Sequence, residues 1–169
     1  MPLPAPPDVM EVFLQPGEFY FGEERTRIRT LLGSCVAVSL WHPQLRIGGM
    51  CHYMLPHRPH PRGREPLDGR YADEAMQLFA AELRRSRTHA AQYHAKVFGA
   101  GAMFAQAPGR HPDISARNMA AAGELLARHG FQVHAQDIGG RGHRNVILDL
   151  WSGDVWLKRV PLRSAPAPA

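Results

Sequence analysis

Two residues in the first third of the chain, Cys35 and His52, are of the types that form a nucleophile and its base. A thiol becomes a nucleophile when it ionises, and a neighbouring imidazole can take its proton and later return one to a leaving group. Cys35 follows Gly33 and Ser34, a small-residue turn whose backbone amides are able to hold an oxyanion. This segment therefore contains the components of cysteine-based nucleophilic catalysis.

The stretches around Cys35 and His52 predict two adjacent β-strands. Residues 35–40 and 48–54 are rich in strand-forming residues and are separated by a short segment with a proline, so we expect an antiparallel pair that brings both side chains to one face. Because strand side chains alternate, Cys51 should face the opposite side and serve in packing. The spacing alone also fits a cysteine and a histidine that only pack in a core.

The wider pattern predicts an α/β (α+β-like) fold, a layered sandwich of mixed β-sheet with two main helices. Apolar residues at helical spacing predict helices over 71–87 and 115–129, and Gly130 ends the second. The last two expected strands form a hairpin around Ser152-Gly153-Asp154. The expected strands are 10–14, 27–31, 35–40, 48–54, 95–98, 131–135, 146–151 and 155–160.

Proline marks the ends of the expected domain. We expect a disordered N-terminal segment at 1–9, a single domain at 10–160 and a disordered Pro/Ala-rich tail at 161–169. Within the domain, residues 56–70 contain four prolines and no apolar period, which predicts a long loop. Long loops in compact domains are often functional. This loop carries four arginines, so it is either a contact for an acidic partner surface or a solvated variable loop.

The composition limits the classes of function. The sequence has 169 residues, two cysteines, a net charge of +5 and a pI near 9.8, but its arginines are scattered, so we expect no nucleic-acid partner. No apolar run reaches membrane-span length and no secretory signal opens the chain, so we expect a cytoplasmic protein without membrane insertion and with both thiols reduced.

Two other sequence features are weak indications of a cofactor. His57 and His60 lie in the proline-rich loop without carboxylate or thiolate companions, so we expect no metal site. The run Gly99-Ala100-Gly101-Ala102 lacks the third glycine of a dinucleotide fingerprint, and we expect its glycines to allow close backbone packing. We therefore expect no cofactor.

Several blocks of the sequence resemble the chemoreceptor glutamine deamidase family, CheD. The similarity begins with Leu32-Gly33-Ser34-Cys35 and with Gly48-Gly49-Met50-Cys51-His52 and extends over roughly residues 10–160 in the order of that family. The further blocks are Arg70-Tyr71-Ala72-Asp73, 96–104, Ile114-Ser115-Ala116-Arg117-Asn118, and Asp137-Ile138-Gly139-Gly140 with Arg144.

The resemblance to CheD implies a hydrolase that converts glutamine side chains of methyl-accepting chemotaxis receptors to glutamate, without a cofactor or metal. It implies that Cys35 attacks the carboxamide to give a thioester, that His52 activates the thiol, and that a threonine orients the imidazole. It also implies the cytoplasmic region of the receptors, and a CheC-type phosphatase, as partners.

The orienting threonine is the point where this sequence departs from the family pattern. The motif places threonine six residues before the cysteine, where this chain has Arg29, whereas Thr30 lies five before it. One residue reverses the face of a strand. We assign the role to Thr30 on the assumption that a bulge or deletion in the turn at 31–33 compensates, with Ser34 as the alternative.

Two other functions remain open at the level of sequence. One is a non-catalytic chemotaxis adaptor that binds receptors or a CheC-type phosphatase. The other is a general cysteine peptidase or amidase.

Overall fold

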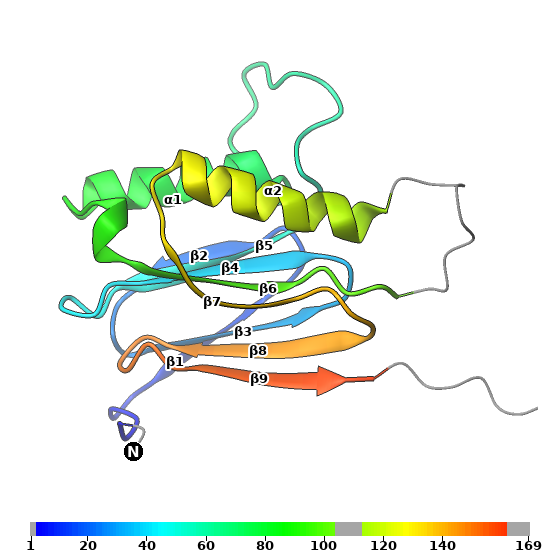
Figure 1. The fold of residues 1–169 in the computed structure, drawn as a ribbon. Helices are drawn as coiled ribbons and strands as arrows, with labels where there is room; N and C mark the ends of the chain where they lie inside the picture. The colour runs from blue at the N-terminus through cyan, green and yellow to red at the C-terminus, as the bar shows by residue number, and fades with distance from the viewer. Residues whose placement is uncertain (1–2, 104–112, 162–169) are drawn as a thin grey trace, which may run out of the picture.

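The chain folds into three layers, with two helices on one sheet and a second sheet on the other side of it (Figure 1). The computed structural model describes residues 3–103 and 113–161. Residues 162–169 of the expected tail and residues 1–2 of the expected N-terminal segment lie outside the described residues. Among the described helices, none has the length and apolar character needed to cross a membrane.

The central layer is a five-stranded sheet in the order β2-β5-β4-β6-β7. Its middle strand β4 is apolar almost throughout and is buried on both faces, since it lies between the helices and the second sheet. Within this sheet, only β6 and β7 pair in parallel. The bounds are β2 Phe19–Gly22, β4 Val36–Trp41, β5 Gly48–Tyr53, β6 His94–Gly99 and β7 Val133–Ile138.

The second layer is a four-stranded sheet in the order β1-β3-β8-β9. In β3 the residues alternate between buried and more exposed, because one face packs on the central sheet and the other faces solvent. The strands β8 and β9 form the predicted terminal hairpin. The bounds are β1 Met10–Leu14, β3 Thr26–Leu32, β8 His143–Asp149 and β9 Val155–Val160.

Two helices cover the central sheet on the side away from the second sheet. Helix α1, Ala72–Arg85, has Asp73 and Glu74 in its first turn and two arginines in its last, which matches the helix dipole. Helix α2, Ile114–Arg128, is capped by Asp113, whose side chain accepts a hydrogen bond from the Ser115 amide. A short 3-10 helix, Ala90–Gln92, precedes β6.

The layers enclose two apolar clusters, one on each face of the central sheet. The cluster between the helices and the central sheet includes Phe79, Leu126 and Cys51. The cluster between the two sheets includes Ile28, Leu148 and Met50. The fold class predicted from sequence is confirmed, but the sequence pattern indicated neither the division of the strands between two sheets nor the short strand β2.

Candidate active site

Cys35 and His52 lie on the same side of the central sheet, facing the second sheet. In the antiparallel pair of β4 and β5, Ala37 is the direct partner of His52, and Cys35 precedes Ala37 by two residues. Cys35 is therefore the diagonal neighbour of His52, a relation that leaves side chains within reach of each other. His52 is 1% exposed, whereas the Cys35 side chain is half-buried. The predicted placement of the pair on one face is thus what the structure shows.

Thr30 reaches the site from the opposite sheet. Its Oγ1 atom lies 2.6 Å from Nδ1 of His52 and donates a hydrogen bond of 3.0 Å to the Leu14 carbonyl oxygen. The register of β3 with β8 is regular over residues 27–32, so the bulge or deletion assumed from the sequence is absent there. Thr30 faces the site because alternation along β3 places Arg29 on the outer face and Thr30 on the inner one.

The hydrogen bonds of Thr30 favour one tautomer of the neutral imidazole ring. A hydroxyl has one proton to donate, and that proton goes to the Leu14 carbonyl, which can only accept. The proton between Thr30 and His52 must then sit on Nδ1. Nε2 of His52 is left with its lone pair, which is the atom required to take a proton from a thiol.

Burial keeps both members of the pair uncharged at neutral pH. Desolvation lowers the pKa of His52 to about 4 and raises the pKa of the Cys35 thiol above its ordinary value. A thiolate–imidazolium pair is therefore disfavoured before substrate arrives. The arrangement suits a reaction in which the proton leaves the sulfur as the sulfur attacks.

Cys51 lies on the other face of β5, in the cluster below the helices, as strand alternation predicted. It is completely buried, and burial raises its thiol pKa to about 12. Such a thiol stays protonated and inaccessible. Cys51 is therefore a packing residue, which leaves Cys35 as the half-buried thiol.

The end of β6 packs backbone against backbone on the turn that carries Cys35. The Ala100 amide donates to the Cys35 carbonyl at 2.8 Å, and the Gly101 amide donates to the Gly33 carbonyl at 3.0 Å. A Cβ added at Gly99 would lie 2.2 Å from the Cys35 carbonyl oxygen. The expectation that these glycines allow close packing is confirmed, and they do so beside the candidate nucleophile.

Arg144 braces this segment from the second sheet and was not singled out by the chemistry of its residue type. It is 2% exposed and donates to Asp137 Oδ1 at 2.8 Å, to the Gly99 carbonyl at 3.1 Å and to the Gly139 carbonyl. A buried guanidinium is tolerated only when its donors are satisfied in this way. The one sequence signal was its place in a block shared with CheD.

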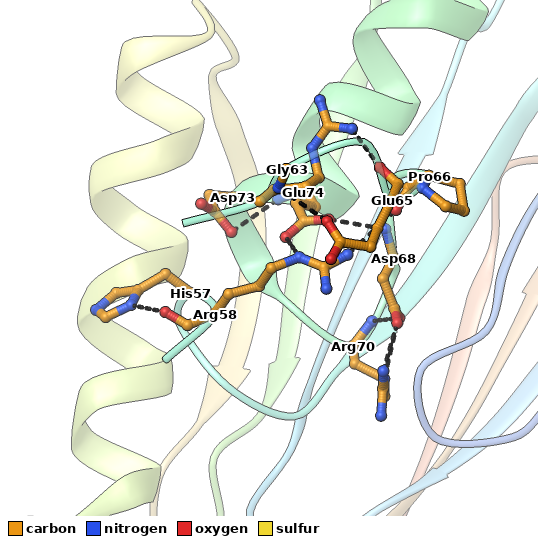
Figure 2. A network of polar contacts seen from close by, with 10 residues as sticks. His57, Arg58, Gly63, Glu65, Pro66, Asp68, Arg70, Asp73 and Glu74 are labelled. Atoms are coloured by element: carbon orange, nitrogen blue, oxygen red, sulfur yellow. Dashed lines mark hydrogen bonds and ion pairs between the residues drawn. The ribbon is translucent and has the colours of Figure 1, made fainter. Parts of the chain in front are cut away.

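The long loop at 56–70 is organised by one buried carboxylate (Figure 2). Glu74 of α1 accepts hydrogen bonds from Nε and a terminal nitrogen of Arg58 at 2.6 and 3.0 Å, and from the Asp68 amide at 3.0 Å. Arg58 also donates to the Pro66 carbonyl, and its guanidinium lies over the Tyr71 ring. The loop starts three residues after the end of β5 and stands out beyond the helix layer (Figure 1).

The histidines of this loop do not gather with other ligands in the described structure. His57 contacts the Arg58 carbonyl through Nδ1. Across residues 3–103 and 113–161, no group of three or more His, Cys, Asp or Glu side chains is placed to hold a metal ion.

Comparison with known proteins places the chain in a family. The family model described as CheD chemotactic sensory transduction matches residues 54–159. A probable chemoreceptor glutamine deamidase CheD 3 of Dechloromonas aromatica is 49% identical over 153 residues, which cover 90% of this chain and 89% of the relative. This chain belongs to the CheD family. The resemblance inferred from the sequence blocks is thereby confirmed.

Other CheD relatives show similar coverage. A probable chemoreceptor glutamine deamidase CheD of Pseudomonas syringae pv. tomato is 46% identical over 159 residues, or 93% of this chain and 94% of the relative. A probable chemoreceptor glutamine deamidase CheD 1 of Leptospira interrogans is 39% identical over 161 residues, which cover 91% of this chain and 95% of the relative. The match to the CheD family model begins at residue 54, after His52. The alignments with the relatives cover at least 90% of this chain and therefore include residues 30–52, where Thr30, Cys35 and His52 lie.

Proposed function

We propose that this chain is a chemoreceptor glutamine deamidase in which Cys35 is the nucleophile, His52 the base and Thr30 the residue that orients the base. One observation carries the assignment of the site. The hydroxyl of Thr30 holds Nδ1 of His52 at 2.6 Å, and His52 lies on the same face of the central sheet as Cys35. The activity itself is the one named for its CheD relatives.

The first half of the reaction forms a thioester. Nε2 of His52 takes the thiol proton as Cys35 Sγ attacks the carboxamide carbon of a receptor glutamine, and the amide oxygen becomes an oxyanion. The imidazolium then gives that proton to the amide nitrogen, and the carbon–nitrogen bond breaks. Ammonia leaves, and the glutamine acyl group remains on sulfur.

The second half releases glutamate. The neutral imidazole of His52 takes a proton from water, the hydroxide attacks the thioester carbon, and the carbon–sulfur bond breaks. The proton returns to Cys35 Sγ. Thr30 stabilises the imidazolium in both halves because its oxygen accepts from Nδ1 throughout.

The cellular setting follows from the same proposal. The substrate is the cytoplasmic region of methyl-accepting chemotaxis receptors, where each conversion adds a negative charge and creates a methylatable glutamate. The enzyme therefore acts in the cytoplasm, as one domain over residues 10–160. A CheC-type phosphatase is a further proposed partner.

A direct assay tests the proposal. Purified protein is incubated with a receptor cytoplasmic fragment, and peptide mass spectrometry follows the conversion of glutamine to glutamate. Wild type should convert, Cys35→Ala and His52→Ala should lose at least about a hundredfold, and Cys51→Ala should stay within about threefold of wild type. Unchanged conversion by Cys35→Ala would overturn the assignment of the nucleophile.

The same assay separates the alternatives. A non-catalytic adaptor would bind the fragment without converting it, and a peptidase would cut the backbone. Parallel Thr30→Ala and Ser34→Ala variants address the third role, and we expect only Thr30→Ala to lose activity substantially.

A further inference from the structure

A fully buried asparagine on helix α2 holds the peptide that carries the Cys35 amide. Asn118 is 0% exposed, and its Nδ2 donates to the Ser34 carbonyl at 3.3 Å and to the Met54 carbonyl at 2.9 Å. Both partners are acceptors, so the nitrogen must face them and the orientation of the amide is fixed. Asn118 thus joins the turn before the nucleophile to the end of the strand that carries His52.

The position of Asn118 is costly for stability by itself. Its Oδ1 is buried and has no hydrogen-bond partner among the described residues. An unsatisfied buried acceptor costs about 1–3 kcal/mol, which an apolar side chain of similar size would avoid. Any benefit that offsets this cost must come from the nitrogen, whose two hydrogen bonds hold the Ser34 and Met54 carbonyls.

The Ser34 carbonyl and the Cys35 N–H belong to the same peptide group. The described chain has no cis peptide bonds, and in a planar trans peptide the carbonyl and the N–H point in opposite directions. Since the Ser34 carbonyl is held toward α2, the Cys35 N–H points away from α2. The Cys35 side chain packs on that same side, against the cluster between the sheets.

The Cys35 N–H is available to a ligand. Within the described residues it donates no hydrogen bond, although the Cys35 carbonyl accepts one from Ala100. An unpaired amide beside a nucleophile is the usual donor to the oxyanion of a tetrahedral intermediate. Its direction matters because such donors act only when they are held in place before the reaction.

Building on the proposed deamidase function, we propose that Asn118 is a positioning residue that holds the Ser34–Cys35 peptide so that the Cys35 N–H stabilises the oxyanion. The residue acts through the peptide and does not touch the substrate. Its loss should therefore weaken acyl transfer without changing the reactivity of the thiol itself.

Two reactions of Cys35 distinguish this role from a structural one. Deamidation passes through an oxyanion, whereas alkylation by iodoacetamide is a direct displacement at carbon that needs only the thiol and its base. For Asn118→Ala we expect kcat for deamidation of a receptor cytoplasmic fragment to fall roughly 100- to 1000-fold. We expect the alkylation rate of Cys35 and its pH profile to stay within about threefold of wild type.

A matched control comes from the same helix. Asp113 caps α2 by accepting a hydrogen bond from the Ser115 amide at 3.0 Å, so Asp113→Ala removes a side-chain contact of this helix that is not made to the Cys35 turn. Its kcat should stay within about threefold of wild type. If Asn118→Ala fails to fold, Asn118→Ser tests the same prediction with a shorter polar side chain.

The outcomes separate this proposal from the function on which it rests. If deamidation and alkylation fall together, Asn118 only keeps the site intact and the positioning role is wrong. Unchanged deamidation in Asn118→Ala overturns it as well. Absence of conversion by wild type would instead overturn the proposed function.

Discussion

The Thr30 hydroxyl on β3 meets the His52 imidazole on β5 at 2.6 Å, across the interface of two different sheets. The contact is completely buried, and the Thr30 oxygen is held in turn by the Leu14 carbonyl on β1. The packing of the second sheet on the first therefore orients the candidate base. In the proposed mechanism, catalysis depends on that interface.

Replacing Thr30 with valine should remove the orientation while keeping the shape of the side chain. Without an acceptor on Nδ1, His52 loses about 1.5–3 kcal/mol of stabilisation of its protonated form, which corresponds to a roughly 10- to 100-fold lower kcat/KM. Receptor-fragment deamidation measures the effect. Thr30→Ser retains the hydroxyl and should keep most of the activity, and a Thr30→Val enzyme within twofold of wild type would contradict the role.

The site shows which features a sequence can predict. The placement of His52 and Cys51 on opposite faces of β5 was predictable, because consecutive side chains of a strand point to opposite faces of the sheet. The contact between Thr30 and His52 could not be predicted in this way, because it joins strands of two different sheets. The alternation of residues along a strand does not indicate which sheet the strand belongs to. No bulge in β3 is needed, because the packing of the two sheets brings Thr30 to His52.

The features that the sequence did not predict leave little local signal in it. Asn118 bonds two backbone carbonyls, and Arg144 bonds two more in addition to the Asp137 side chain. Because every residue has a backbone carbonyl, the sequence does not mark these partners. The strand β2, Phe19–Gly22, is four residues long and half-buried throughout, without the alternation that predicts a strand. The helices were predicted to within a few residues because their apolar period and Gly130 are local.

Burial of His52 should make the stability of the protein depend on pH. The folded pKa of about 4 lies below the unfolded value of 6.5, so the unfolded chain binds the proton more readily. The contribution is complete above pH 6.5 and is lost as the pH falls toward 4. Relative to His52→Gln, the free energy of unfolding of wild type should drop by on the order of 2 kcal/mol between about pH 7 and about pH 4.5.

Urea unfolding at several pH values measures this difference for His52. The exposed His57 offers a control, and His57→Gln should follow wild type at each pH. A gap between wild type and His52→Gln that stays constant with pH would show that His52 is not held neutral by burial.

Gly99→Ala should displace the candidate nucleophile. Gly99 has φ of +114°, and an added Cβ would meet the Cys35 carbonyl oxygen at 2.2 Å, so either β6 or the Cys35 turn must move. We expect kcat/KM to fall at least about tenfold, because small misplacement of reacting groups is costly. Gly140, with φ of +70° and open space at its Cβ position, provides a control for backbone strain alone.

Gly140→Ala should lose about 1–2 kcal/mol of stability and retain its activity. Comparable loss of activity in both alanine variants, measured well below their thermal midpoints, would assign the effect of Gly99→Ala to strain and not to displacement of Cys35.

Glu74→Gln should release the loop at 56–70. The variant keeps the size of a side chain that is almost completely buried but removes the charge that holds both donors of Arg58, so the guanidinium and the loop lose their main anchor. We expect trypsin to cleave after Arg62 and Arg64 several times faster than in wild type, as measured by mass spectrometry of the fragments. Glu82→Gln removes the exposed Arg85 pair of the same helix and should leave the cleavage rate unchanged. Equal cleavage of wild type and Glu74→Gln would mean that the prolines alone hold the loop.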